Sequence, residues 1–160
     1  MTNQDANMSL GIDYRPATLS DVEAIVQMFA DDPLGAQRED AASAFAQPYI
    51  NAFQAIDTDP NNELIVAVCS DDVVGVFQIT YIPYLTHKGA WRALIEGVRV
   101  HRKYRGRGIG KAMIEWAINR AHEKACKCVQ LTTDKSRGDA IRFYEELGFQ
   151  ASHEGFKLWF

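Results

Sequence analysis

The spacing of apolar residues divides the chain into segments of two kinds. Apolar residues three and four positions apart predict helices that bury one face, and short runs rich in β-branched and aromatic residues predict strands. The predicted strands are residues 12–15, 64–69, 73–81, 91–100, 128–132, 149–151 and 157–160. The predicted helices are residues 20–30, 39–55, 108–124 and 136–147. Ser136 or Asp139 is expected to cap the last of these helices.

Capping and turn residues set several of these boundaries. Ser20, with Glu23 three residues later, has the pattern of a capping box at the start of the first helix. Pro48 is expected to interrupt the second helix. The polar run 70–72 predicts a tight hairpin turn between two strands, and Gly148 predicts the end of the last helix.

The order of these elements predicts the fold class. One strand and two helices come first, then three strands joined by hairpins, and then strands alternate with helices to the end. This mixture predicts an α+β fold in which a mixed, largely antiparallel and twisted sheet is covered by helices. Residues 1–10 are polar and aperiodic, and we expect a flexible N-terminal segment there. Residues 11–160 are expected to form a single domain.

Composition and charge exclude several classes of protein. The chain is 47% hydrophobic and 24% charged, which is ordinary for a globular protein, and its net charge of −4 argues against general nucleic-acid binding. No apolar run approaches the ~18 residues of a membrane span, and no early segment resembles a signal peptide. Cys126 and Cys128 could recruit a metal with His122, but a reduced cytoplasmic pair is the favoured interpretation. We therefore expect a cytoplasmic protein without nucleic-acid, membrane or metal partners.

A basic, glycine-rich loop joins the predicted strand 91–100 to the predicted helix 108–124. Six cationic residues lie within positions 99–111, and no acidic residue lies within positions 98–113. Glycines let a backbone approach a ligand closely, and the N-terminus of a helix offers free N–H groups to an anion. A polyphosphate is therefore the predicted ligand, and a basic surface turn that caps the helix is the alternative. The glycines are Gly106, Gly108 and Gly110.

The spacing of these glycines differs from two common phosphate-binding motifs. A Walker loop needs glycine where Arg105 stands and serine or threonine where Ala112 stands. In a dinucleotide-binding motif the third glycine would come one residue after Gly110. The pattern that remains is Arg-x-x-Gly-x-Gly, formed by Arg105, Gly108 and Gly110. It resembles the acetyl-coenzyme A loop of the GCN5-related N-acetyltransferases (GNAT).

A second block supports this resemblance. Within residues 139–149, a helix that carries Phe143 and Tyr144 leads into a Leu-Gly-Phe sequence, as at the end of GNAT domains. Together with residues 14–17 near the start, the resemblance covers all of the chain except its polar N-terminus. It implies the acyl-CoA N-acyltransferase (GNAT) fold, in which coenzyme A enters a gap between the fourth and fifth strands. It also implies acetyl-CoA as cosubstrate and a homodimer as a possible assembly.

The resemblance also implies which residues bind the cofactor. The strand that ends at Val100 would pair with the pantetheine arm through backbone groups, and the amides of residues 107–111 would hold the pyrophosphate. Arg137 stands where many relatives have an asparagine that contacts pantetheine, so it is a candidate for binding coenzyme A phosphates or the substrate. The predicted cofactor-binding residues are Val98, Arg99, Val100, Arg105, Gly106, Arg107, Gly108, Ile109, Gly110, Lys111, Arg137 and Tyr144.

Glu96 is the candidate general base for acetyl transfer. In a regular strand Glu96 would share one face with the aliphatic residues Leu94, Val98 and Val100, which is an unusual place for a carboxylate. Gly97 beside it could mark a bulge that redirects the side chain. The alternative is a structural carboxylate paired with an arginine.

Tyr144 is the candidate general acid. A tyrosine has a pKa of about 10 and a thiol of about 8.5, so a protonated Tyr144 can donate to the sulfur that leaves as thiolate. The alternative is an aromatic core residue packed against its neighbours in the motif.

These residues predict an enzyme that transfers an acetyl group from acetyl-CoA to a primary amine of a small molecule. Direct attack is expected, because no cysteine lies in a motif suited to nucleophilic catalysis. An amino acid, a polyamine or an aminoglycoside-like molecule would serve as acceptor. Two alternatives stay open, namely an acetyltransferase of protein N-termini or lysines and a non-catalytic sensor that binds acetyl-CoA.

Overall fold

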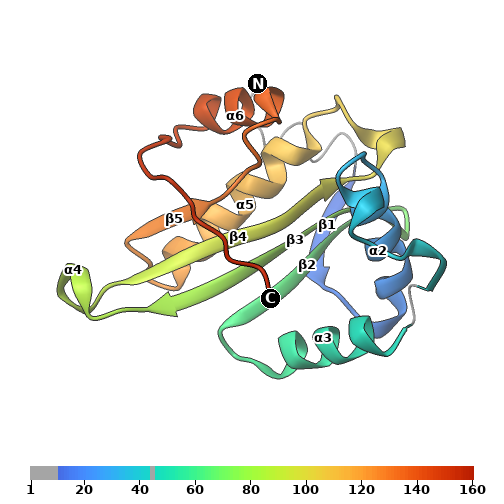
Figure 1. Cartoon of the computed structure of the whole chain (residues 1–160), viewed down its shortest axis with the longest axis horizontal. Coiled ribbons are helices and arrows are strands. Elements are labelled where there is room, and N and C mark those ends of the chain that lie inside the picture. Colours follow the sequence, from blue (N-terminus) through green and yellow to red (C-terminus); the bar gives the residue numbers. More distant parts are fainter. Residues whose placement is uncertain (1–10, 44–45) are drawn as a thin grey trace. The chain divides into compact units, whose positions relative to one another are not determined.

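The structure is a computed structural model that describes residues 11–43 and 46–160 (Figure 1). The predicted flexible segment 1–10 lies outside these residues, as do positions 44 and 45 of the predicted second helix. Residues up to Gln130 and residues from Leu131 form two compact units, which are described in turn. A single domain over residues 11–160 stays a prediction.

The first unit is built on a five-stranded sheet in the order β1-β2-β3-β4-β5 (Figure 1). The strands from β1 to β4 pair antiparallel, each with the next. The backbone N–H of Lys127 donates to the carbonyl of Trp91 at 2.8 Å, so β5 begins beside the start of β4. A connection through a helix then makes these two strands parallel, and the predicted mixed α+β sheet is confirmed. The strands are β1 (Ile12–Pro16), β2 (Asn62–Cys69), β3 (Asp72–Pro83), β4 (Trp91–Val100) and β5 (Cys128–Leu131).

The helices of this unit follow the predicted order with shifted ends. Pro48 lies in the first turn of α3 and begins this helix instead of interrupting one, because a first-turn N–H needs no partner within the helix. The α-helices are α2 (Val22–Ala30), α3 (Gln47–Thr58), α4 (Thr86–Gly89) and α5 (Ile109–Glu123). The 3-10 turns are η1 (Leu19–Asp21), η2 (Gly35–Gln37), η3 (Ala41–Ser43) and η4 (Arg102–Tyr104).

Helices cover both faces of the sheet. On one face Val76 of β3 packs in a buried cluster with Ile25 and Met28 of α2. The next residue, Phe77, points to the other face, and its ring centre lies 5.8 Å from that of Trp116 in α5. We call these the α2 face and the α5 face. Because side chains alternate along a strand, each strand residue can be assigned to one of them.

The start of α2 differs from the prediction. Both the backbone N–H and the hydroxyl of Thr18 donate to Asp21 Oδ2, at 2.7 and 2.9 Å, so Thr18 and Asp21 form the capping box in place of Ser20 and Glu23. Arg15 of β1 donates two further hydrogen bonds to Asp21, at 2.7 and 2.9 Å. The predicted hairpin turn is confirmed, with left-handed Ser70 (φ 48°) between β2 and β3.

The second unit contains α6 (Gly138–Glu146), which ends before Gly148 as predicted. Neither predicted cap is used. Ser136 donates its N–H and hydroxyl to Asp134 in a turn, and Arg137 occupies the cap position.

Residues 149–151 and 157–160 are not strands, which corrects the prediction. The side chains of Phe156 and Phe160 are fully exposed or nearly so. An apolar run forms a strand only when a neighbouring strand pairs with its backbone, and the described residues give this segment none.

We predict that Asp21→Asn lowers the free energy of unfolding by about 2 kcal/mol at pH 7, because it removes charge-assisted hydrogen bonds and a helix cap. The hydrogen bonds from Arg15 lower the pKa of Asp21 below its ordinary value. Its contribution is therefore present above the unfolded pKa of about 3.9 and is lost as the pH falls through the lower folded pKa. Urea titrations from pH 7 to pH 3 should show the free energies of unfolding of the wild type and of Asp21→Asn approaching each other as the pH falls. Asp57→Asn, at an exposed position in α3, is the control, and an equal loss there would contradict the assignment.

Candidate functional site

A β-bulge shapes the second half of β4. Gln78 of β3 pairs with Glu96, and Val76 pairs with Arg99, so β4 has one residue more than β3 between these pairs. Gly97 lies at the bulge with φ 62°, as the sequence predicted. A Cβ there would stand 3.3 Å from the ring of Phe29 in α2. Glycine therefore meets both the conformational and the steric demand of this position.

The bulge corrects the prediction that Glu96 and Val100 share a face. Val100 pairs with Gly75, whose missing Cβ makes room for Met113 of α5, so Val100 lies on the α5 face. Glu96 lies opposite Gln78 on the α2 face.

Glu96 is exposed, and its carboxylate makes no hydrogen bond or ion pair with the residues that the structure describes. Within that part of the chain the alternative of an arginine-paired structural carboxylate therefore has no support. Its role as a base stays a prediction.

The glycine loop presents bare backbone. Gly106 and Gly108 have φ values of 75° and 80°, and a Cβ added to either would meet no atom within 4 Å. Gly108 caps α5, and the side chain of Ile109 is buried at 2% exposure, which anchors the first turn in the core. The first N–H groups of a helix have no partner within it, so the amides of residues 109–111 are available to an anion. A pyrophosphate group fits this loop by shape and by chemistry.

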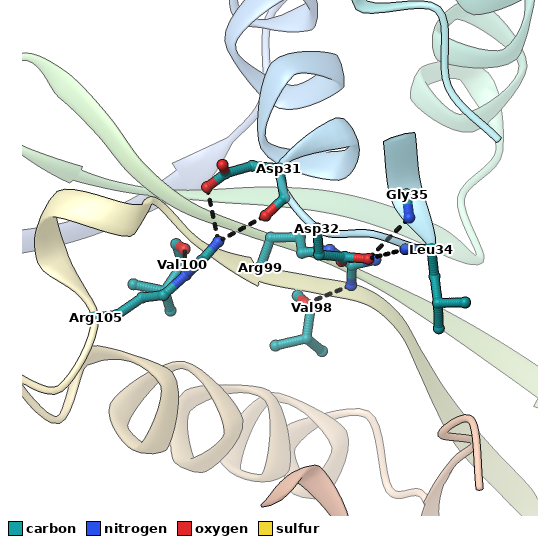
Figure 2. Close-up of polar contacts among 8 residues, drawn as sticks. All are labelled: Asp31, Asp32, Leu34, Gly35, Val98, Arg99, Val100 and Arg105. Carbon is teal, nitrogen blue, oxygen red and sulfur yellow. Dashed lines mark hydrogen bonds and ion pairs between the residues drawn. The ribbon is translucent and has the colours of Figure 1, made fainter. Parts of the chain in front are cut away.

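Two arginines of the predicted cofactor set connect β4 to the end of α2 (Figure 2). Arg105 donates to the carbonyl of Val100 at 2.9 Å and to the carboxylate of Asp31 at 2.8 Å. Arg99 donates to the carbonyl of Val98 at 2.9 Å and lies 3.4 Å from the carboxylate of Asp32. We call these four charged residues the arginine clasp.

The clasp also orders the turn after α2. Asp32 accepts hydrogen bonds from the backbone N–H groups of Leu34 and Gly35, at 3.0 and 2.8 Å. Asp31 and Asp32 come directly after the predicted helix 20–30, and no local pattern in the sequence predicted their contacts with arginines of β4 and the glycine loop. The carbonyls of Val98 and Val100 each accept one hydrogen bond in the clasp, and a carbonyl has a second lone pair for another donor such as pantetheine.

The other predicted residues are placed as follows. Arg107 lies 5.4 Å from the ring of Tyr104, and Lys111 lies 3.9 Å from Glu115. In the second unit Arg137 precedes α6, and the ring of Tyr144 contacts those of its neighbours Phe143 and Phe149. The roles of Arg137 and Tyr144 stay predictions.

The described residues offer neither a metal site nor a membrane-spanning helix. No group of three or more His, Cys, Asp or Glu side chains there could hold a metal ion. No helix described there combines the length and apolarity needed to cross a membrane.

Strand β4 thus runs through a glycine bulge into an open amide loop at the start of α5. Residues 22–149 match the family described as "Acetyltransferase (GNAT) family", and the chain belongs to it. The family uses acetyl-CoA as cosubstrate.

Several known proteins are similar to this chain. Aminoalkylphosphonate N-acetyltransferase of Salmonella typhimurium is 30% identical over 107 residues, which are 67% of this chain and 69% of that protein. Glucosamine 6-phosphate N-acetyltransferase of Trypanosoma brucei brucei is 34% identical over 54% of this chain, and the match spans 56% of that protein's length. A structure described as a transcriptional regulator from Bacillus halodurans C-125 has a TM-score of 0.90 and 53% identity, and covers 93% of this chain and 99% of its own.

We predict that Gly108→Ala lowers acetyl-CoA affinity about tenfold or more, because a methyl group would hold the phosphates away from several amides. Gly89→Ala is the matched control, since Gly89 also has a positive φ (72°) and open space around a Cβ. Both variants should lose about 1–2 kcal/mol of stability from the left-handed conformation.

Lys111→Ala should weaken binding less, because one exposed charge contributes about 1 kcal/mol at most. Calorimetric titration measures all three variants. Equal losses of acetyl-CoA affinity for Gly108→Ala and Lys111→Ala would indicate that charge, and not loop geometry, holds the cofactor.

Proposed function

We propose that this protein is an acetyl-CoA-dependent N-acetyltransferase whose acceptor is the primary amine of a small molecule. The observation that carries the proposal is the arrangement along β4. This strand presents the carboxylate of Glu96, which has no hydrogen-bond or ion-pair partner among the described residues, before the bulge and leads into the open amide loop after it. The relatives named for aminoalkylphosphonate and glucosamine 6-phosphate are acetyltransferases of small amines, which supports this class of acceptor.

The proposed reaction uses residues of this chain for binding and proton transfer. The amides of residues 107–111 hold the pyrophosphate, with Arg99 and Arg105 beside them, and the backbone of Val98 and Val100 aligns the pantetheine arm. The acceptor arrives as an ammonium ion and loses a proton to Glu96, directly or through water. Its nitrogen then attacks the thioester carbonyl and a C–N bond forms. The C–S bond breaks, and the nitrogen gives its second proton to water. Tyr144 gives its proton to the departing thiolate and takes one back from solvent.

The cysteines support direct attack without an acetyl-enzyme. Burial raises the pKa of the Cys126 thiol, which lowers the fraction of nucleophilic thiolate at neutral pH. Cys69 and Cys128 lie outside the loop and β4. We also propose a cytoplasmic location and leave the homodimer as a prediction for solution measurements.

A second candidate is a non-catalytic sensor of acetyl-CoA. The observation in its favour is the description of the 53% identical structure as a transcriptional regulator. A sensor would keep the amide loop and would need neither Glu96 nor Tyr144 for chemistry.

An amine-library screen with release of free coenzyme A as the signal distinguishes these functions. We expect turnover with small primary amines above the rate of acetyl-CoA hydrolysis. Turnover of peptides alone would indicate a protein acetyltransferase. Tight acetyl-CoA binding without turnover of any amine or peptide would indicate the sensor.

We predict that Tyr144→Phe lowers kcat by about 10²–10⁴, the usual contribution of general acid catalysis, and leaves acetyl-CoA affinity nearly unchanged. The deficit should shrink with an acyl donor whose thiol is more acidic, because that thiolate needs less help to leave. Steady-state kinetics with both donors and a melting curve test this.

Tyr81→Phe is the matched control for this variant. It removes a buried hydroxyl from the α5 face, and this hydroxyl has no hydrogen-bond partner among the described residues. Its kcat should be normal. A folded Tyr144→Phe protein with normal kcat would leave Tyr144 as a packing residue.

A further inference from the structure

Three polar side chains accompany Glu96 on the α2 face. Gln78 lies directly opposite Glu96 in the register of β3 and β4. Asn62 of β2 lies opposite Thr80, two residues further along β3 and therefore on the same face. All three are half-buried. The carboxylate at the bulge thus belongs to a polar surface that extends over three strands.

One side chain organises this surface. Asn62 Oδ1 accepts hydrogen bonds from Gln78 Nε2 at 3.0 Å and from the Thr80 hydroxyl at 2.6 Å. Asn62 Nδ2 donates to Asp59 Oδ2 at 2.6 Å. An ionised carboxylate can only accept hydrogen bonds, so the amide nitrogen of Asn62 must face Asp59. The amide oxygen of Asn62 therefore faces Gln78 and Thr80. Asp59 itself is held by the backbone N–H of Asn61 at 2.8 Å.

These hydrogen bonds decide what the surface offers to a ligand. The hydroxyl proton of Thr80 and one N–H of Gln78 are directed to Asn62. The groups that remain are Gln78 Oε1, the lone pairs of Thr80, one N–H of Gln78 and the carboxylate of Glu96. Gln78 Oε1 has no hydrogen-bond partner among the described residues. The surface is therefore rich in acceptors, and Glu96 gives it a negative charge.

The two cations that β4 carries on this face are engaged elsewhere. Arg99 lies beyond the bulge, and its guanidinium faces Asp32 at 3.4 Å in the clasp (Figure 2). Arg92 lies at the other end of the strand, and its guanidinium is 5.0 Å from the centre of the Tyr84 ring. An ammonium ion carries up to three N–H donors and one positive charge, which matches two neutral oxygen acceptors, Gln78 Oε1 and the Thr80 hydroxyl, beside one carboxylate.

We propose that Gln78, Thr80 and Glu96 form the site that binds the acceptor's ammonium group, with Asn62 as its positioning residue. This inference rests on the proposed acetyltransferase function and narrows its substrate class. The acceptor is a small primary amine with a further donor group near the nitrogen, either a second ammonium or a hydroxyl. An anionic group beside the amine would face oxygen acceptors and a carboxylate, so such amines bind poorly.

Variants of Thr80 and Asn62 test the site. Thr80→Val keeps the shape of the side chain and removes its oxygen, and it should raise KM for the amine about tenfold, the loss expected for a hydrogen bond to a charged group. Thr80→Ser restores the oxygen and should restore KM. Asn62→Ala releases both Gln78 and Thr80 and should raise KM for the amine at least as much. KM for acetyl-CoA should stay within about twofold in every variant.

Asn51→Ala is the matched control. Asn51 is exposed on α3, its side-chain oxygen accepts a hydrogen bond from Gln47 at 2.7 Å, and all kinetic constants should be unchanged. Melting curves accompany each variant. If Asn62→Ala fails to fold, the Thr80→Val and Thr80→Ser pair still decides the result.

The acceptors to compare are 1,4-diaminobutane and 2-aminoethylphosphonate. We expect kcat/KM to favour the diamine at least tenfold, and a preference for the phosphonate would overturn the proposed substrate class. Calorimetric titration of the diamine into protein saturated with coenzyme A measures amine binding without turnover.

The outcomes separate this inference from the proposed function. Diamine binding that Thr80→Val weakens, without turnover, supports the ammonium site and contradicts the enzyme. Turnover with unchanged KM in both Thr80→Val and Asn62→Ala supports the enzyme and overturns the site. Neither binding nor turnover of any amine overturns both.

Discussion

The left-handed glycine in β4 is the constraint on which the candidate site depends. Glu96 and Arg99 are three residues apart, and in a regular strand they would point to opposite faces. The extra residue at Gly97 brings both to the α2 face, because Glu96 pairs with Gln78 and Arg99 pairs with Val76. The carboxylate of Glu96, which has no cation partner in the part of the chain that the structure describes, and a guanidinium held by Asp32 therefore occupy one face of the same strand.

The clasp and the glycine loop offer an anion two different kinds of donor, side chains in the clasp and backbone amides in the loop. Arg99 and Arg105 have carboxylate partners, so their charges are partly compensated before any ligand is considered. Among the described residues, no carboxylate binds the amides at the start of α5. Under the proposed function, we therefore expect recognition of a pyrophosphate to depend first on backbone geometry, with glycine needed at positions 106 and 108.

Local patterns in the sequence predicted much of the fold. The bounds of β4, the hairpin at Ser70, the bulge at Gly97 and the loop before α5 follow from residue types that are close together in the chain. Capping was ambiguous, because Thr18 and Ser20 each precede an acid by three residues. The choice of Thr18 depends on Arg15, which binds Asp21 from the neighbouring strand.

Contacts between distant positions could not be read from these patterns. Arg105 and Asp31 are 74 positions apart, and Thr80 and Asn62 are 18 apart. Alternation shows that a residue faces one side of a strand, but it does not show which strand lies beside it or in which register. The same limit explains residues 157–160, which have the composition of a strand but no strand to pair with among the described residues.

The order of the strands has a consequence for how the chain folds. From β2 to β4 each strand pairs with the next one in the sequence, so these hairpins close short loops at a small cost in entropy. β1 is different, because residues 17–61 separate it from β2. We expect the hairpins of β2, β3 and β4 to be formed in the transition state for folding, while β1 docks later. Substitutions in β1 should then act mainly on the unfolding rate, and the bulge that shapes the site would belong to the part of the sheet that forms first.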